Sequence, residues 1–225
     1  GQPITPFLQH ETCVYTAGFS PDSRRIVTAC TAVTFAPGTA RVWDAATGQP
    51  VLAPIKHRVG VYGAAFSPNG KFLVTWDDSA RVWDAQTGQP LTPALAHPGT
   101  EVVHVAFSRD SRLLVTSAHK GARVWDAFTG EPVGPMLNHP NKVRWAAFST
   151  EGRRIVTASD DGIVRAWNLR PYELPIEDVF RFVQLFSARQ VNQTGSALKP
   201  LESATIQSAL RTLRGKYPKQ FEAAN

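Results

Sequence analysis

The chain has 225 residues, of which 43% are hydrophobic and 19% are charged, and its formal net charge is +6. This composition supplies enough apolar side chains for a sizeable core and too little charge for a disordered chain, so we expect a globular protein. No stretch approaches the roughly 18 consecutive apolar residues of a membrane-spanning helix. Two cysteines without metal-like spacing fit a reducing compartment, which makes the cytoplasm the expected location.

Four segments of the chain repeat one another. Each runs from a His through a Phe-Ser pair, a turn and a β-branched run ending in Thr to an Arg-x-Trp strand. The tryptophans are Trp43, Trp83, Trp125 and Trp167, which are 40, 42 and 42 residues apart. This matches the roughly 40–45-residue period of a four-stranded propeller blade. The period predicts an all-β propeller with about four blades, at residues 10–56, 57–96, 97–138 and 139–176.

Residues 1–8 do not fit the start of a blade. They align with the segments that begin at Gly48, Gly88 and Gly130, whose prolines each remove a backbone donor and indicate a strand at the outer edge of its sheet. We therefore expect residues 1–9 to be the outer strand of a preceding blade and the natural protein to be longer. Four blades make an open arc, part of a larger propeller, with an apolar face exposed at each end.

Turn residues define the other strands of each repeat. Residues 21–23, Pro-Asp-Ser, separate two β-rich segments in the first repeat, and residues 68–70, Pro-Asn-Gly, do so in the second. Both predict a hairpin. A third strand carries the Arg-x-Trp sequence and ends at an Asp-Ala-x-Thr-Gly turn, after which the outer strand follows.

The composition shifts after Trp167. Apolar residues at helical spacing predict a helix from Pro175 to about Ala188, with acidic residues in its first turn. A second helix is predicted from about Glu202 to Lys216, before Pro218. We therefore expect residues 177–225 to form a two-helix C-terminal extension.

Trp-Asp pairs end the third strand in three repeats, and Trp167 is followed by Asn168 in the fourth. Together with the period, these pairs resemble the WD40 repeat family. In that family a His, a Ser or Thr, an Asp and a Trp form a buried hydrogen-bonded tetrad within a blade. The resemblance implies a complete tetrad at His139, Thr157, Asp161 and Trp167. It implies partial tetrads at His10, Thr28 and Trp43, at His57, Thr75, Asp77 and Trp83, and at His97, Thr116 and Trp125.

Each partial tetrad is expected to leave a His or Trp donor less well satisfied, at a cost of about 1 kcal/mol per lost bond. The first repeat lacks the Asp, and the third has Lys120 near its position. In the second repeat Asp77 follows Thr75 by two residues, which indicates a tightened turn. We therefore expect the first and third blades to be looser.

The four periodic histidines are interpreted as structural. Equivalent positions on successive blades are distributed around a ring and cannot converge on one ion at ligand distances near 2 Å, so no metal site is expected. Cys13 and Cys30 fall on neighbouring strands of one hairpin. Free thiols are the preferred interpretation in a reducing compartment, and a disulfide is the alternative.

The C-terminal segment, with its Leu213-Arg214-x-Lys216-Tyr217-Pro218 ending, resembles the extension that follows WD40 repeats in large bacterial serine/threonine protein kinases. This resemblance implies an upstream kinase domain. The chain itself contains no Gly-rich nucleotide loop and no catalytic-loop motif, so we expect no enzymatic activity, no catalytic residue and no cofactor.

Candidate binding residues stand three or four positions before the Phe of each first strand. They are Tyr15, Tyr62, His104, Arg144 and Trp145. Aromatic and Arg side chains dominate interface hot spots, so we predict a non-catalytic protein-interaction scaffold of a signalling protein, with a protein or peptide partner. Packing between blades is the alternative role of these side chains. The alternative functions are a structural closure element, a ligand-sensing propeller, a propeller enzyme and a polyanion binder, and the diffuse positive charge does not favour nucleic acid.

Overall fold

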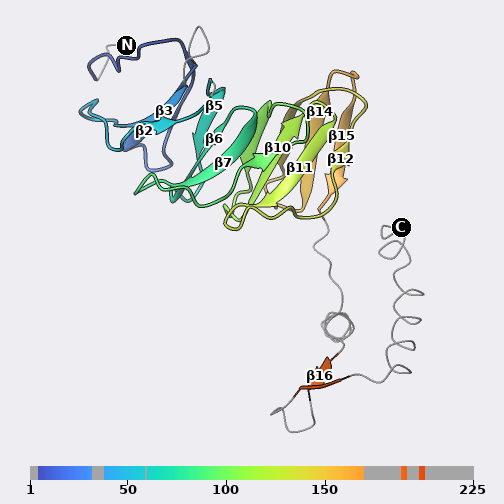
Figure 1. Cartoon of the computed structure of the whole chain (residues 1–225). Helices are drawn as coiled ribbons and strands as arrows, with labels where there is room; N and C mark the ends of the chain where they lie inside the picture. Colours follow the sequence, from blue (N-terminus) through green and yellow to red (C-terminus); the bar gives the residue numbers. More distant parts are fainter. Residues whose placement is uncertain (1–4, 32–37, 59, 170–188, 192–197, 201–225) are drawn as a thin grey trace. The chain divides into compact units, whose positions relative to one another are not determined.

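The computed structural model describes residues 5–31, 38–58, 60–169, 189–191 and 198–200. The chain forms two compact units, Gly1–Leu169 and Arg170–Asn225. The first unit holds the four repeats as four antiparallel sheets, which follow one another in chain order from blue to orange (Figure 1). Among the described residues, no helix is long and apolar enough to cross a membrane.

Each sheet is one blade built from consecutive strands. Blade 1 contains β1 (Val14–Phe19), β2 (Arg25–Cys30), β3 (Thr39–Asp44) and β4 (Ile55–Lys56). Blade 2 contains β5 (Gly63–Phe66), β6 (Phe72–Trp76), β7 (Ser79–Asp84) and β8 (Leu95–Ala96). Blade 3 contains β9 (His104–Phe107), β10 (Leu113–Ala118), β11 (Gly121–Asp126) and β12 (Leu137–Asn138). Blade 4 contains β13 (Val143–Phe148), β14 (Arg154–Ser159) and β15 (Val164–Asn168).

The outer strands are short, as their prolines predict. β4, β8 and β12 have two residues each and pair only with β3, β7 and β11. Blade 4 departs from the expected four strands, because within the described part of the chain β15 has no outer partner. The Gly-x-Pro sequence that precedes the outer strands does not recur after Trp167, whereas residues 1–8 contain it.

The first hairpin of each blade closes through one repeated turn. Ser23, Gly70, Ser111 and Gly152 occupy the same turn position with φ values of 59°, 69°, 62° and 70°. In blade 1 the Ser20 hydroxyl lies 2.6 Å from Asp22 Oδ1 and accepts a hydrogen bond from the Arg25 amide at 2.9 Å. Blades 2 and 3 repeat this arrangement, so the sequence 21–23 and its counterparts form the predicted hairpins.

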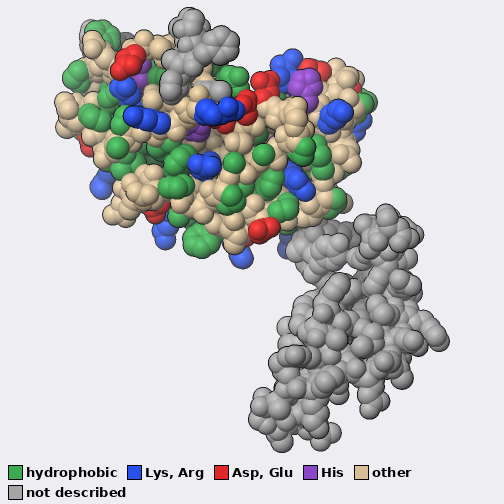
Figure 2. Space-filling view, in the orientation of Figure 1, with side chains coloured by type: hydrophobic (Ala, Val, Ile, Leu, Met, Phe, Trp, Pro, Cys, Tyr) green, Lys and Arg blue, Asp and Glu red, His purple; other side chains and the backbone are tan. Residues whose placement is uncertain are grey.

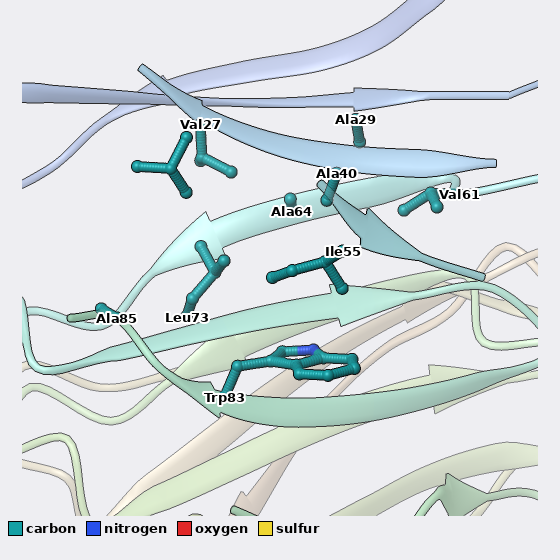
Figure 3. Close-up of a cluster of buried hydrophobic side chains, with 10 residues drawn as sticks. Val27, Ala29, Ala40, Ile55, Val61, Ala64, Leu73, Trp83 and Ala85 are labelled. Carbon is teal, nitrogen blue, oxygen red and sulfur yellow. The ribbon is translucent and has the colours of Figure 1, made fainter. Parts of the chain in front are cut away.

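The hydrophobic core lies between blades. Its three clusters each combine one blade with the next, and Figure 3 shows the first, in which Val27, Ala40 and Ile55 of blade 1 meet Leu73 and Trp83 of blade 2. The second cluster joins blades 2 and 3, and the third joins blades 3 and 4. Burial of apolar area is the main favourable term in folding, so each blade depends on its neighbours for stability.

The second unit is described only at one hairpin. β16 (Arg189–Val191) and β17 (Leu198–Pro200) pair antiparallel, and the sequence had not predicted these strands. The two helices predicted at residues 175–188 and 202–216 lie outside the described residues.

Candidate functional site

The predicted tetrad of blade 4 comes together in the structure. Thr157 on β14 accepts a hydrogen bond from the Trp167 indole at 2.8 Å, and its Oγ1 lies 2.8 Å from His139 Nε2. The other His nitrogen, Nδ1, lies 3.4 Å from Asp161 Oδ2. His139 and Thr157 are buried. This series of hydrogen bonds therefore joins the loop before β13 to two strands inside the sheet.

A fifth residue, Arg165 on β15, completes this network. Its Nη1 donates to Asp161 Oδ2 at 2.8 Å and lies 2.5 Å from His139 Nδ1. The hydrogen bond from Arg165 is the main cause that lowers the pKa of Asp161 to about 2. The sequence pattern did not reveal this role, although an Arg recurs two residues before every repeat Trp.

Blade 2 has a tetrad with one contact missing. Trp83 donates to Thr75 at 2.8 Å, and His57 Nδ1 lies 2.9 Å from Asp77 Oδ2, so Asp77 takes the acidic position despite its close spacing. Burial alone would raise the pKa of Asp77, but hydrogen bonds from His57 and Ser79 outweigh it and lower the pKa. The buried Nε2 of His57 has no hydrogen-bond partner among the described residues.

Blades 1 and 3 hold their histidines without a carboxylate. In blade 3, His97 Nε2 lies 2.6 Å from Thr116, and its buried Nδ1 has no partner in the described region. Burial, with Arg123 nearby, lowers the pKa of His97 to about 4. In blade 1, His10 Nδ1 lies 2.7 Å from the thiol of Cys30, which stands where blade 2 has Asp77.

The expected loss of hydrogen bonds therefore falls on the histidines alone. All four tryptophan indoles donate to the Thr of their blade at 2.8–2.9 Å. Among the tetrad side chains of the described region, the buried nitrogens without a hydrogen-bond partner are on His10, His57 and His97. Cys13 and Cys30 are free thiols, and burial raises the pKa of Cys30. In the part of the chain that the structure covers, no three metal-ligating side chains lie close enough to share an ion.

The candidate binding residues form an aromatic surface where the first strands begin. We call Tyr15, Tyr62, His104, Arg144 and Trp145 the aromatic rim. Tyr15 is 59% exposed, Tyr62 38% and Trp145 46%, so part of each of these three side chains is accessible to solvent. Burial of His104 lowers its pKa and favours its neutral form.

The rim aromatics lie in two pairs across blade boundaries. The rings of Tyr15 and Tyr62 meet edge to face with centroids 6.5 Å apart, which joins blades 1 and 2. The rings of His104 and Trp145 are 5.6 Å apart, which joins blades 3 and 4. Such contacts favour a fixed arrangement of the rings in each pair.

Three cationic side chains around the aromatic rim lie close to carboxylates. Arg144 Nε donates to both carboxylate oxygens of Asp160, at 2.8 and 3.0 Å. Lys142 Nζ lies 2.6 Å from Glu101 Oε1, and the guanidinium of Arg58 lies 4.0 Å from Asp78. Figure 2 likewise shows positive and negative side chains interspersed over the face in view. The surface therefore combines aromatic side chains with charges of both signs.

The opposite rim, formed by the hairpin turns, contains a groove that no sequence motif predicted. It is lined by Arg25, Lys71, Phe72, Asp84 and Phe128, among others. The Arg25 guanidinium lies 5.0 Å from the Phe66 ring centroid and donates to the carbonyls of Gly70, at 3.0 Å, and Ala85. Arg25 thus joins blade 1 to blade 2 and is held in a structural role.

Comparison with known proteins identifies the repeats. The family described as "WD domain, G-beta repeat" matches residues 1–44, 48–84, 88–126 and 130–168. No curated protein matches the sequence significantly. The structure resembles the computationally designed Ika4 protein, with 26% identity and a TM-score of 0.64, over 76% of this chain and 99% of that one. It also resembles the computationally designed Ika8 protein, with 25% identity and a TM-score of 0.62, over 74% of this chain and 49% of that one.

Proposed function

Because this chain belongs to the WD40 repeat family, whose domains generally mediate protein interactions, we propose that it is a non-catalytic scaffold that binds a protein or peptide segment on its aromatic rim. The observation that carries this proposal is the exposure of Tyr15, Tyr62 and Trp145 at the ends of rigid strands. Large aromatic side chains bury much area at little conformational cost, and they are enriched at binding hot spots.

The charge around the rim favours a protein partner over a polyanion. Lys142 and Arg144 each lie within 3 Å of a carboxylate, which reduces the positive charge that these two side chains present at the rim. Binding of nucleic acid draws most of its affinity from unpaired cations. A peptide with apolar anchors and a few charges of either sign fits this surface better.

The arrangement of the carboxylates supports a non-catalytic role. Asp160 and Asp161 are adjacent in sequence, but Asp160 pairs with Arg144 at the surface and Asp161 with His139 and Arg165 in the tetrad. They do not converge on a common point, as a hydrolytic pair would. We further propose a cytoplasmic bacterial signalling protein, such as a serine/threonine kinase, as the natural context, on the resemblance of the C-terminal segment alone.

The test is selection of peptides from a random display library on the immobilised chain, followed by titration of an enriched peptide. We expect the combined substitution Tyr62→Ala and Trp145→Ala to weaken binding about tenfold or more, since removal of hot-spot aromatics costs about 2 kcal/mol or more. Phe128→Ala is the control, because Phe128 is 66% exposed on the opposite rim. Enriched peptides that bind both variants equally would show that the aromatic rim is not the site.

A further inference from the structure

A second pocket, which we call the blade 2 pocket, lies beside the tetrad of blade 2. Its volume is about 270 Å³, slightly below the roughly 300–1,000 Å³ of pockets for drug-sized ligands, so it suits a single anchoring group. Lys56, Arg58 and Arg81 supply three cations to its lining, and Asp77 and Asp78 supply two carboxylates. The lining therefore has one more positive than negative side chain.

Both carboxylates of the blade 2 pocket already have partners within the chain. Asp77 Oδ2 lies 2.9 Å from His57 Nδ1, and Asp77 Oδ1 accepts a hydrogen bond from the amide of the residue two positions later at 2.9 Å. Asp78 lies 4.0 Å from the Arg58 guanidinium. Among the residues that the structure describes, no carboxylate lies within 4 Å of Lys56 or Arg81. These two side chains therefore carry the excess of positive charge.

Arg81 differs in its partners from equivalent arginines in other blades. Arg165 of blade 4 donates to the tetrad carboxylate at 2.8 Å, and Arg41 of blade 1 lies 3.8 Å from Glu11. The Arg81 guanidinium lies over the Trp83 ring, 5.6 Å from its centroid, and borders the pocket. Stacking of this kind orients the planar guanidinium and leaves its N–H groups at the edge of the plane for a ligand.

The blade 2 pocket lies close to the aromatic rim. The Tyr62 amide donates to the Trp76 carbonyl at 2.9 Å, and the next residue, Asp77, lines the pocket. Burial, followed by the negative charges of Glu101 and Asp78, raises the pKa of Tyr62, as expected for a phenol near carboxylates. A ligand in the pocket can therefore be part of a peptide that also contacts Tyr62.

We propose, on the basis of the proposed function, that the blade 2 pocket binds a carboxylate of the peptide partner. This carboxylate takes the place on Arg81 that Asp161 takes on Arg165. It accepts hydrogen bonds from the Arg81 guanidinium and is attracted by the charge of Lys56, while neighbouring residues of the peptide contact Tyr62. A guanidinium and a carboxylate match in geometry through two parallel hydrogen bonds. An acidic side chain and a C-terminal carboxylate share this chemistry.

The charges of the pocket favour a carboxylate over other ligand groups. A cation would be repelled by Lys56 and Arg81, which have no carboxylate within 4 Å in the described region. A phosphate group brings about two negative charges next to Asp77 and Asp78. A carboxylate brings one negative charge, which matches the excess of one cation.

The first test uses small carboxylates, so it does not depend on a peptide partner. N-acetylglutamate amide carries a side-chain carboxylate, N-acetylglycine a main-chain carboxylate, and N-acetylglutamine amide is the neutral control. By nuclear magnetic resonance we expect at least one carboxylate to shift the Arg81 Nε–H signal saturably, with no shift from the neutral amide and none at Arg123. The absence of a saturable shift with both carboxylates, or tighter binding of inorganic phosphate, overturns the proposal.

The second test uses an enriched peptide from the display selection. We expect Arg81→Gln to weaken its binding about tenfold, since a charge-assisted hydrogen bond is lost. Arg123→Gln is the matched control, because Arg123 holds the same position in blade 3 and lies over Trp125, 5.1 Å from the ring centroid. We expect it to leave the affinity unchanged within about twofold.

A change on the peptide completes this test without altering the protein fold. Replacing the peptide's carboxylate by an amide is expected to cost as much as Arg81→Gln, and the two changes together no more than either alone, because both remove one interaction. Peptides that depend on Tyr62 and Trp145 but bind Arg81→Gln as tightly as the parent chain overturn this proposal and leave the proposed function intact. Peptides that depend on Arg81 alone support the pocket and count against the aromatic rim.

Discussion

At the scale of single residues, the partner of each repeat His decides how that His is held. The spacing of the repeats predicted the His, Thr and Trp positions, because strand register places them on one face of the sheet. It did not predict that Cys30 would contact His10 or that Arg165 would contact Asp161. The sequence did contain a signal for the contact between Cys30 and His10, since Cys30 follows Thr28 by two residues as Asp77 follows Thr75. The contact between Arg165 and Asp161 depends on the direction of the Arg165 side chain on β15, which an Arg-x-Trp pattern alone does not reveal.

The buried His97 makes the stability of the first unit depend on pH. Its pKa is lowered to about 4, mainly by burial, whereas the unfolded chain takes up this proton near pH 6.5. Between these values the unfolded state binds more protons, so the stabilisation is complete above pH 6.5 and is lost as the pH falls towards 4. We expect the free energy of unfolding to drop by about 2 kcal/mol from this residue between pH 7 and pH 5.

Urea unfolding at the two pH values, followed by far-UV circular dichroism, checks this expectation. His97→Gln removes the titrating group. We therefore expect the change in the free energy of unfolding between pH 7 and pH 5 to be about 2 kcal/mol smaller in this variant, whatever the substitution does to stability at pH 7. His119→Gln is the matched control, because His119 is exposed. An unchanged difference between pH 7 and pH 5 in His97→Gln would contradict the assignment.

At the scale of elements, turn chemistry predicted most of the strands. Proline and glycine patterns placed the hairpin turns and the outer edge strands, because they act through backbone geometry that needs no tertiary information. The same reasoning gave four strands in blade 4, where the described residues form three. It also missed β16 and β17, since three-residue strands carry too few side chains to show a period.

The repeated hairpin turn predicts a stabilising substitution in blade 1. Ser23 has a φ of 59°, a left-handed conformation that costs a residue with a Cβ about 1 kcal/mol, and the equivalent position in blade 2 is Gly70. We expect Ser23→Gly to raise the free energy of unfolding by up to about 1 kcal/mol, because the relief of strain exceeds the added freedom of the unfolded chain. Thermal unfolding by calorimetry measures the gain. Gly70→Ser is the reverse substitution, and a loss of stability in both variants would show that φ is not the governing factor.

At the scale of the whole molecule, the first unit is stabilised by apolar clusters that lie between successive sheets. The period predicted blades that stack in chain order and an arc with two apolar end faces, and the core clusters lie at the three junctions that this stacking creates. The sequence did not predict which end-face residues are most exposed, because Val164 is an ordinary strand residue until a neighbouring blade is present or absent. The aromatic rim was predicted by position alone, whereas its two ring pairs depend on how adjacent blades meet.

A pair of cavity-forming substitutions tests this arrangement, because Leu114 and Ile26 occupy the same position in blades 3 and 1. Leu114 is fully buried at the junction of blades 2 and 3, and its counterpart Ile26 is half-buried. We expect Leu114→Ala to cost about 2–5 kcal/mol and Ile26→Ala roughly 1 kcal/mol of the free energy of unfolding, as measured by urea unfolding. Equal costs would mean that Ile26 is covered as fully as a residue at an internal junction.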